Sequence, residues 1–248
     1  MTVPTQWLRQ IEEVCAIVDI QHVDLLLDQT AWDNCAVPAL RHMQPEAPWF
    51  SLFSGMPEEN LLDQAPLLMR LTLTHWQHKA WLEELLENCA TDARLLVVIS
   101  PLSFEVLSQA MQTLSHVQWG GQSCLLRFYD PRIFPVLMGS ILSEEQRARY
   151  LQLVSYWGWL DRDHQAQWLT GTYPAGQGNC LPAVQEVNDE QYDLIGCIAD
   201  AQKLLVSGKF SGLDESFERR FDLLYDQVVQ ASRENYFGDL SEYVQQKR

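Results

Sequence analysis

Residues 94–114 read RLLVVISPLSFEVLSQAMQTL, and this stretch carries the clearest fold signal in the chain. It opens with a short apolar run over residues 94–99 that is rich in β-branched side chains and predicts a buried strand. Ser103 then stands where a helix N-cap is expected, and apolar residues follow it at helical spacing. A buried strand followed directly by an amphipathic helix indicates a mixed α/β core.

The segments before this unit predict further strands and helices. Strands are expected over residues 16–20, 49–53 and 67–73. One helix is expected to begin at Asp24 and another to span residues 75–88, where Thr74 can act as the cap. Residues 37–49 contain three prolines and therefore predict a loop.

Local signals after residue 114 predict two hairpins and two helix starts. Gly120-Gly121 predicts a hairpin of residues 117–119 and 123–129, since its tight turn needs positive φ. Asp130-Pro131 predicts a helix start, and Ser143-Glu144-Glu145-Gln146 predicts another as a capping box. The second hairpin is expected from residues 156–160 and 166–170.

Composition changes at residues 171–179, GTYPAGQGN, whose glycines and proline predict a linker. Only helices are expected beyond it, over residues 188–206, from Asp214 to about residue 236, and from Leu240 onward. The predicted fold class is α+β. A mixed α/β lobe with a small central sheet, residues 1–175, is followed by an all-helical C-terminal lobe, residues 176–248.

The charge balance is acidic, with 17 Lys and Arg residues against 33 Asp and Glu residues and a net charge of −16. Nucleic acid and anionic membranes require a basic surface, so we expect neither as a partner. Acid is concentrated in residues 1–60, which hold nine acidic and two basic residues. This region either steers a basic protein partner or serves solubility alone.

No apolar run approaches the ~20 residues that a membrane-spanning helix requires. The first residues lack the features of a secretory signal, so a cytoplasmic location without membrane insertion is expected. The cysteines are scattered and form no C-x-x-C pair, which indicates reduced thiols. There are six: Cys15, Cys35, Cys89, Cys124, Cys180 and Cys197.

Few residues suggest chemistry. His75 and His78 stand three apart on a predicted helix and could chelate a metal, but no third ligand is spaced to match, which favours a plain helix surface. Asp161, Asp163 and His164 lie in a predicted turn, where Asp is common for turn geometry alone. No nucleotide-binding, serine-hydrolase or metalloprotease motif is present. We therefore expect no enzyme activity, no cofactor and no metal.

Residues 125–132, LLRFYDPR, form the most distinctive block. A strand that carries Arg127 and Tyr129 on the same side would place Asp130 and Arg132 at the end of the sheet. These residues then form either a recognition site or a purely structural unit. In the structural alternative, which we favour, Asp130 is a helix cap and Arg127 pairs internally with a carboxylate such as Asp19.

Tryptophans cluster in the second predicted hairpin. Trp157 and Trp159 lie on one side of the first strand, and Trp168 is expected to face them from the second. Such a cluster is typical of a core or of a binding hot spot, and we favour the core.

Several blocks in order resemble a family of domains of unknown function that serves as type VI secretion effector chaperones, also called adaptors. The blocks are AIVD at 16–19, SLFSGMP at 51–57 with APLL at 65–68, VVISPLS at 97–103, LRFYDPR at 126–132, and the aromatic hairpin from YWGW at 156–159 to Trp168. The resemblance covers roughly residues 15–170, and its most specific block is residues 126–132. The C-terminal helices match no motif of the family.

The resemblance implies a cytoplasmic, non-catalytic adaptor. Such a protein is expected to bind one cognate type VI effector, through the effector's N-terminal region, and to assist its loading onto a VgrG-type spike. We expect the effector to dock in the groove between the two lobes, with the helical lobe as a clamp. The alternatives are a small enzyme of unrecognised type and a structural subunit of the secretion machine. The candidate residues for partner binding or for structure are Asp19, Arg127, Tyr129, Asp130, Arg132, Trp157 and Trp159.

Overall fold

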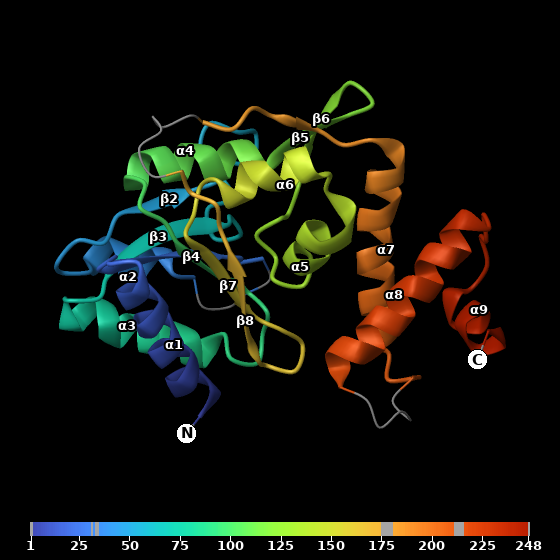
Figure 1. Cartoon of the computed structure of the whole chain (residues 1–248), viewed down its shortest axis with the longest axis horizontal. Helices are drawn as coiled ribbons and strands as arrows, with labels where there is room; N and C mark the ends of the chain where they lie inside the picture. The colour runs from blue at the N-terminus through green and yellow to red at the C-terminus, as the bar shows by residue number, and fades with distance from the viewer. Residues whose placement is uncertain (1, 31, 33–34, 175–180, 211–215, 248) are drawn as a thin grey trace.

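The computed structural model describes residues 2–30, 32, 35–174, 181–210 and 216–247. Its centre is a six-stranded sheet in the order β2-β3-β1-β4-β7-β8, in which all neighbouring strands are antiparallel (Figure 1). The strands are β1 (His22–Leu27), β2 (Trp49–Ser51), β3 (Leu67–Thr72), β4 (Leu95–Ile99), β7 (Tyr156–Leu160) and β8 (Ala166–Thr170).

Strand β4 lies near the middle of this sheet, and all five of its residues are buried. Leu96 and Val98 belong to one hydrophobic cluster, while Leu95, Val97 and Ile99 belong to a second cluster on the opposite face. Because successive side chains of a strand point to opposite faces, an uninterrupted apolar run requires cover on both. The predicted fold class, a mixed α/β part followed by helices, is confirmed.

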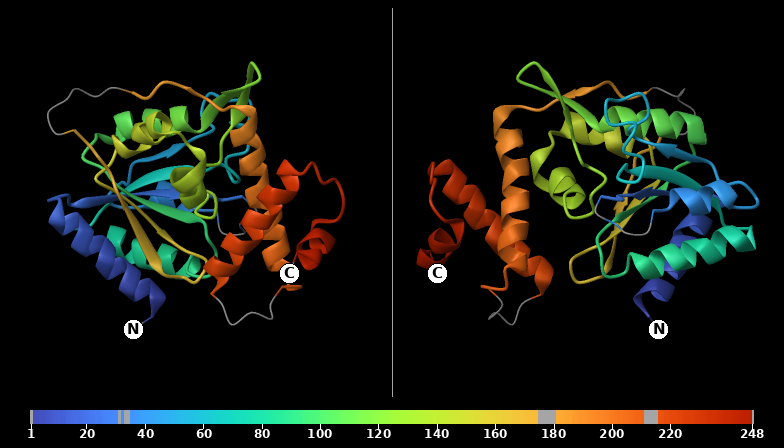
Figure 2. Two further views of the ribbon diagram at one scale, coloured as in Figure 1. Left: turned by 45° about the vertical axis from the view of Figure 1, so that its right-hand side comes forward. Right: turned by 180° about the vertical axis from the view of Figure 1, so that it is seen from behind.

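Helices supply this cover (Figure 2). The face of Leu95 is covered by α1 (Val3–Ile17), α2 (Val37–His42) and α3 (Trp76–Asn88). The face of Leu96 is covered by α4 (Phe104–Leu114), α5 (Phe134–Val136), the π-helical segment η1 (Leu137–Ile141) and α6 (Glu144–Leu151). The predicted caps of α4 and α6 are confirmed, since Ser103 accepts from Val106 N and Ser143 forms a capping box with Gln146.

Two predictions for the N-terminal region are wrong. Residues 16–20 do not form a strand, because α1 continues to Ile17 on a buried stripe at helical spacing. Asp24 does not start a helix but lies inside β1, whose burial on both faces replaces alternation with an apolar run. Asp24 is accommodated there by Arg70 of β3, whose Nε and Nη2 donate to its carboxylate at 2.7 and 2.8 Å.

Two smaller differences concern α2 and α3. Residues 37–49 were predicted as a loop but contain α2, since Pro38 occupies the first turn, where a helix does not use the N–H group. Thr74 does not cap α3. The N-cap position is His75, which makes no capping hydrogen bond through its side chain.

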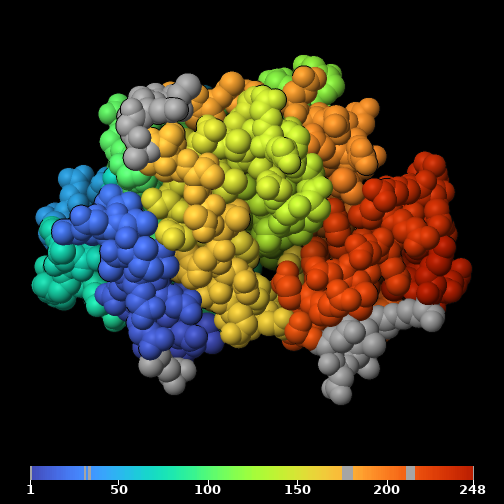
Figure 3. Space-filling view, viewed as in Figure 1, coloured from blue at the N-terminus to red at the C-terminus, as the bar shows by residue number. Residues whose placement is uncertain are grey.

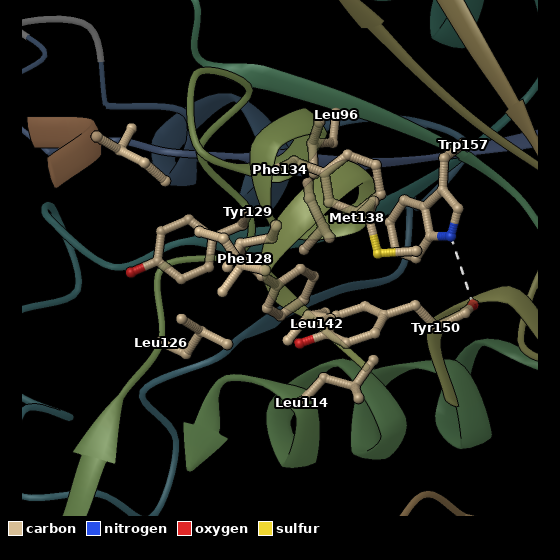
Figure 4. Packing of buried hydrophobic residues seen from close by; sticks show 14 of the residues in the cluster. Leu96, Leu114, Leu126, Phe128, Tyr129, Phe134, Met138, Leu142, Tyr150 and Trp157 are labelled. Carbon is tan, nitrogen blue, oxygen red and sulfur yellow. Dashed lines mark hydrogen bonds between the residues drawn. The ribbon is translucent and has the colours of Figure 1, made fainter. Parts of the chain in front are cut away.

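The hairpin at Gly120-Gly121 is confirmed as β5 (His116–Trp119) and β6 (Gln122–Leu125), and both glycines have positive φ. However, β6 ends four residues before the predicted Tyr129. Phe128 and Tyr129 turn inward instead and pack in the buried aromatic cluster around Trp157 (Figure 4). The helix predicted to start at Asp130-Pro131 begins only at Phe134, after a turn in which Asp130 O accepts from two backbone N–H groups.

The second hairpin, β7–β8, is also confirmed, but its tryptophans do not all lie together. Trp157 and Trp159 lie on the face of Leu96, as predicted. Trp168 packs with the cluster on the opposite face, so the expectation that it faces them is wrong. Trp168 instead covers Gly158, its partner across the hairpin, where a Cβ would come within 2.7 Å of its ring.

Beyond the hairpin, the last part of the predicted linker, residues 175–179, lies outside the described residues. A short strand, β9 (Gln185–Glu186), then pairs in parallel with β5 to complete a small sheet in the order β6-β5-β9. The expectation that only helices follow residue 179 is therefore wrong for these two residues. The pairing holds the returning chain beside the first part of the fold.

The C-terminal helices are α7 (Asp189–Val206), α8 (Phe217–Arg233) and α9 (Leu240–Gln246). Asn188 caps α7, and Ser216 caps α8; the predicted start of that helix, Asp214, lies outside the described residues. Buried side chains of α7 and α8 belong to the same hydrophobic cluster as Leu96 and Val98. None of the helices in the described part of the chain is both long and apolar enough to span a lipid bilayer.

Gly171 and Gly196 provide a matched test of this packing. A Cβ on Gly171 would overlap the backbone carbonyl of Val154, whereas a Cβ on Gly196 of α7 would meet no atom within 4 Å. We expect Gly171→Ala to destabilise the protein by about 2 kcal/mol or more, and Gly196→Ala to stabilise it by about 1 kcal/mol through helix propensity. Urea unfolding of both variants measures this, and equal stabilities would contradict the backbone path at residue 171.

Candidate functional site: a groove between the sheet edge and helix α7

Charged side chains gather at one edge of the six-stranded sheet. Strands β1 and β7 end there and β4 begins there, because neighbouring strands are antiparallel. Asp28 follows β1, Arg94 precedes β4 and Arg162 follows β7. The Asp28 N–H donates to Arg94 O at 2.8 Å, and Arg94 Nη1 donates to Thr30 O at 2.7 Å. These bonds fix the chain that leads into and out of the sheet.

Arg127 reaches this edge from the turn after β6. Its Nη2 donates to Asp28 Oδ2 at 2.6 Å and lies 3.7 Å from Asp130 Oδ2. Burial acts against the charged form, but the Asp28 carboxylate outweighs it, so the pKa of Arg127 lies above its ordinary value. The predicted internal pair therefore exists with a different partner: Asp28 stands at the end of the first strand, while Asp19 lies in the turn before that strand.

Asp130 binds the guanidinium group of Arg132. Its buried carboxylate accepts from Arg132 Nε at 2.9 Å and from Arg132 Nη2 at 2.7 Å, and it also accepts from the Arg132 backbone N–H. These hydrogen bonds raise the pKa of Arg132. Asp130 thus fixes the turn and Arg132 in one geometry, with about two-fifths of the Arg132 side chain exposed to solvent.

The remaining candidate residues lie away from solvent or away from this edge. Tyr129 is buried beside Phe128, and burial raises the pKa of its hydroxyl. Trp157 is fully buried and donates from Nε1 to Tyr150 O at 3.4 Å (Figure 4). Trp159 is half-buried against Phe134. Of the seven candidates, the structure brings together Arg127, Asp130 and Arg132.

A groove of about 530 Å³ opens between these residues and α7. Its apolar surface comes from four residues: Ile133, Ile198, Ala199 and Val206. Its charged and polar surface comes from six: Arg127, Asp130, Arg132, Gln202, Lys203 and Ser207. We call this the α7 groove.

A second hollow of about 340 Å³ adjoins the α7 groove, since both are lined by Arg132, Gln202 and Val206. It extends to the tip of the β7–β8 hairpin and to Phe217, the first residue of α8. The space-filling view shows the molecule hollowed where this hairpin, the α5 region and the start of α8 meet (Figure 3). The two hollows together follow the last turns of α7.

Arg162, at the tip of the hairpin, fastens the C-terminal helices beside the groove. Its side chain is only 7% exposed and donates to Glu218 Oε1 at 2.9 Å, to Gln202 Oε1 at 3.2 Å and to Arg132 O at 2.9 Å. Its guanidinium carbon also lies 3.4 Å from the ring centroid of Phe221. Burial lowers the pKa of Arg162, and Glu218 opposes this effect.

Sequence reasoning missed Arg162, Lys203 and Val206. Arg162 stands in a turn, where an arginine normally faces solvent, and its partners lie 30 to 56 residues away along the chain. Val206 gave a usable signal, because it is an apolar residue that does not lie on the buried stripe of α7. Lys203 gave none, since lysine is common on any exposed helix face.

The residues considered for chemistry have structural roles here. His78 is buried rather than on a helix surface, with Nδ1 accepting from the Thr72 N–H and Nε2 within 2.7 Å of Pro45 O. Asp161 accepts from the Asp163 and Gln165 N–H groups, as expected of a turn residue. Among the described residues, no three His, Cys, Asp or Glu side chains are grouped to hold a metal.

The five described cysteines are free thiols, and Cys180 lies outside the described residues. Burial raises the pKa of Cys15 and of Cys89 to about 12, and Asp24 adds to the shift of Cys15. These two thiols therefore stay protonated at neutral pH and are poor nucleophiles.

Arg127→Ala tests the role of the Arg127–Asp28 pair. The change leaves a buried carboxylate without its counter-charge, and we expect a loss of about 2–3 kcal/mol in unfolding free energy, less than for a fully buried pair because Arg127 is partly exposed. Asp28→Asn in the same chain should recover part of the loss. Thermal unfolding of the single and double variants measures this. A wild-type melting temperature for Arg127→Ala, together with lost partner binding, would instead assign Arg127 to recognition.

Asp163→Ala tests how the hairpin caps α8. Asp163 accepts from the Phe217 N–H at 2.7 Å and the Glu218 N–H at 3.1 Å; burial opposes its ionisation, but these bonds hold the pKa of Asp163 below its ordinary value. A lowered pKa means that the contact stabilises the fold above the unfolded pKa of about 3.9 and that this contribution is lost as pH falls below it.

We therefore expect Asp163→Ala to cost about 1–2 kcal/mol at neutral pH, and the difference from wild type to shrink below about pH 4. Denaturant unfolding across pH measures the difference. Glu84→Ala, which removes an exposed carboxylate from α3, is the control and should have the same unfolding free energy as wild type at each pH. A difference between Asp163→Ala and wild type that does not change with pH would contradict the capping role.

Comparison with known proteins places the chain in a family. A family model described as a domain of unknown function, DUF4123, matches residues 25–149, from β1 into α6. This range includes the Arg127–Arg132 block and its partner Asp28. No curated protein and no solved structure matches the chain. Since the matched residues make up half of the sequence, the chain belongs to the DUF4123 family.

Proposed function

We propose that this protein is a cytoplasmic adaptor that binds one type VI secretion effector and assists its loading onto a VgrG-type spike. The observation that carries the proposal is the family match over residues 25–149, which includes the block LRFYDPR on which the resemblance to effector chaperones chiefly rests. In the structure, this block forms one wall of the α7 groove.

The surface of this groove suits protein binding. Val206 is 75% exposed at the end of α7, and Phe217 is 51% exposed at the start of α8, and both line the joined hollows. Exposed apolar side chains beside a concave surface are typical of sites that receive another protein segment. The groove lies between the sheet and the C-terminal helices, which supports the proposal that the effector docks there. That it does so through its N-terminal region is part of the proposal that follows from the family resemblance.

We further propose that the protein acts without catalysis. A covalent or acid–base mechanism requires a nucleophile and a base within hydrogen-bonding distance and a third group that orients them. In the described part of the chain, the thiols of Cys15 and Cys89 have strongly raised pKa values, and both ring nitrogens of His78 already bond to the backbone. The three basic residues that line the groove are each paired with an aspartate: Arg127 with Asp28, Arg132 with Asp130 and Lys203 with Asp200.

Co-expression tests the proposed role. The tagged chain is produced together with the product of the gene beside its own, and the amount of that product retained on the affinity resin is measured. We expect specific retention, and we expect deletion of the chain to stop export of that effector while other effectors are still exported. Normal export of the effector from the deletion strain, or export of the chain itself at effector levels, would contradict an adaptor role.

A further inference from the structure

We propose that the α7 groove binds an apolar segment flanked by acidic side chains, and that this is the chemistry by which the effector is recognised. The inference rests on the proposed function for the identity of the partner. The chemistry of the bound segment follows from the groove itself, which combines an apolar floor with a basic rim.

The apolar floor is built from both sides of the groove. On one side, Ile133 follows the Asp130 turn, and on the other, Ile198, Ala199 and Val206 lie along α7. These three positions of α7 are separated by one and by seven or eight residues, so they share one side of the helix together with Gln202. Val206 also lines the adjoining hollow, so the apolar surface continues toward Phe217.

The rim is basic because the acidic partners of its arginines lie beneath them. The side chains of Arg127 and Arg132 are 39% and 41% exposed, whereas those of Asp28 and Asp130 are 3% and 4% exposed. The groove therefore presents guanidinium N–H groups to solvent while the carboxylates stay below. Arg132 uses Nε and Nη2 for Asp130, which leaves Nη1 without a hydrogen-bond partner among the described residues. A partner carboxylate can accept from such a group.

Lys203 adds a third positive charge to the rim. Its side chain is 77% exposed, and its partner Asp200 does not line the α7 groove. Three basic residues thus line the groove against one acidic residue, Asp130, which is buried. Their formal charges are balanced by Asp28, Asp130 and Asp200, so the groove presents N–H donors without the excess of negative charge that the chain as a whole carries, which is −16.

These exposed N–H donors select the partner. A long polyanion such as nucleic acid would meet the field of the whole acidic surface, so it is repelled. A short segment with a few carboxylates meets mainly the exposed donors of Arg127, Arg132 and Lys203, because salt screens interactions beyond about 8 Å at physiological ionic strength. The apolar floor then requires apolar residues between those carboxylates. The occupant that satisfies both conditions is an acidic, amphipathic segment of a protein.

Two pairs of variants test this, each with a matched control on the same protein. Lys203→Glu reverses a charge on the rim, and Arg233→Glu makes the same change on an exposed residue of α8 outside the groove. Val206→Ser removes an exposed apolar side chain at the last residue of α7. Ile17→Ser does so at the last residue of α1, where the side chain is 72% exposed.

The probes are two synthetic peptides with the same leucine-rich apolar face, one flanked by glutamates and the other by lysines. We expect the glutamate peptide to bind the wild-type chain about tenfold more tightly than the lysine peptide, and Lys203→Glu and Val206→Ser to remove most of this preference. Arg233→Glu and Ile17→Ser should leave it unchanged. Equal binding of the two peptides, or tighter binding of the lysine peptide, would overturn the inference.

The same four variants are then tested for retention of the co-expressed effector. Retention that survives Lys203→Glu and Val206→Ser would overturn the groove as the recognition site and leave the adaptor role standing. A wild-type chain that prefers the glutamate peptide but retains no effector would overturn the adaptor role and leave the preference of the groove for acidic segments standing. Self-association in sedimentation that is abolished by Val206→Ser alone would assign the groove to a second copy of the chain and would also overturn the inference.

Discussion

Strand β4 sends alternate side chains into two separate hydrophobic clusters, so both faces of the sheet must be covered by other elements. On one face, α1, α2 and α3 provide this cover. On the other, the cover extends from α4 through the aromatic cluster to α7 and α8. The C-terminal helices therefore contribute to the same core as the sheet rather than forming a core of their own. This constraint also places α7 where its last turns can form one wall of a groove.

The sheet edge beside this groove shows how buried carboxylates order a surface. Asp28 and Asp130 lie beneath Arg127 and Arg132, and each carboxylate fixes a guanidinium that would otherwise be mobile on the surface. Removing solvent from a charge is costly, so each carboxylate requires its partner, and the arginines stay in place without any ligand. The groove is thus preorganised, and a partner meets ordered hydrogen-bond donors rather than flexible side chains.

Sequence reasoning found the elements whose signals are local. The glycine pair of the first hairpin, the caps at Ser103 and Ser143, and the apolar run of β4 all act within a few residues. It failed where contacts between residues far apart in the sequence determine the local structure or the site. Strand β1 was misread because burial on both faces hides alternation, and the first strand was instead predicted at residues 16–20. Asp19 was therefore expected as the partner of Arg127, where the structure has Asp28. The floor of the groove could not be predicted, because it joins residues near 130 with residues near 200.

Arg132 belongs to two structural units at once. Its guanidinium lines the α7 groove, while its backbone carbonyl accepts from Arg162, the residue that holds Glu218 of α8 and Gln202 of α7. A segment that binds the guanidinium therefore acts on the same turn that anchors the C-terminal helices. Thermodynamic linkage makes this effect mutual: a segment that binds only while those helices are attached stabilises their attachment, and a change that detaches them lowers affinity in the groove.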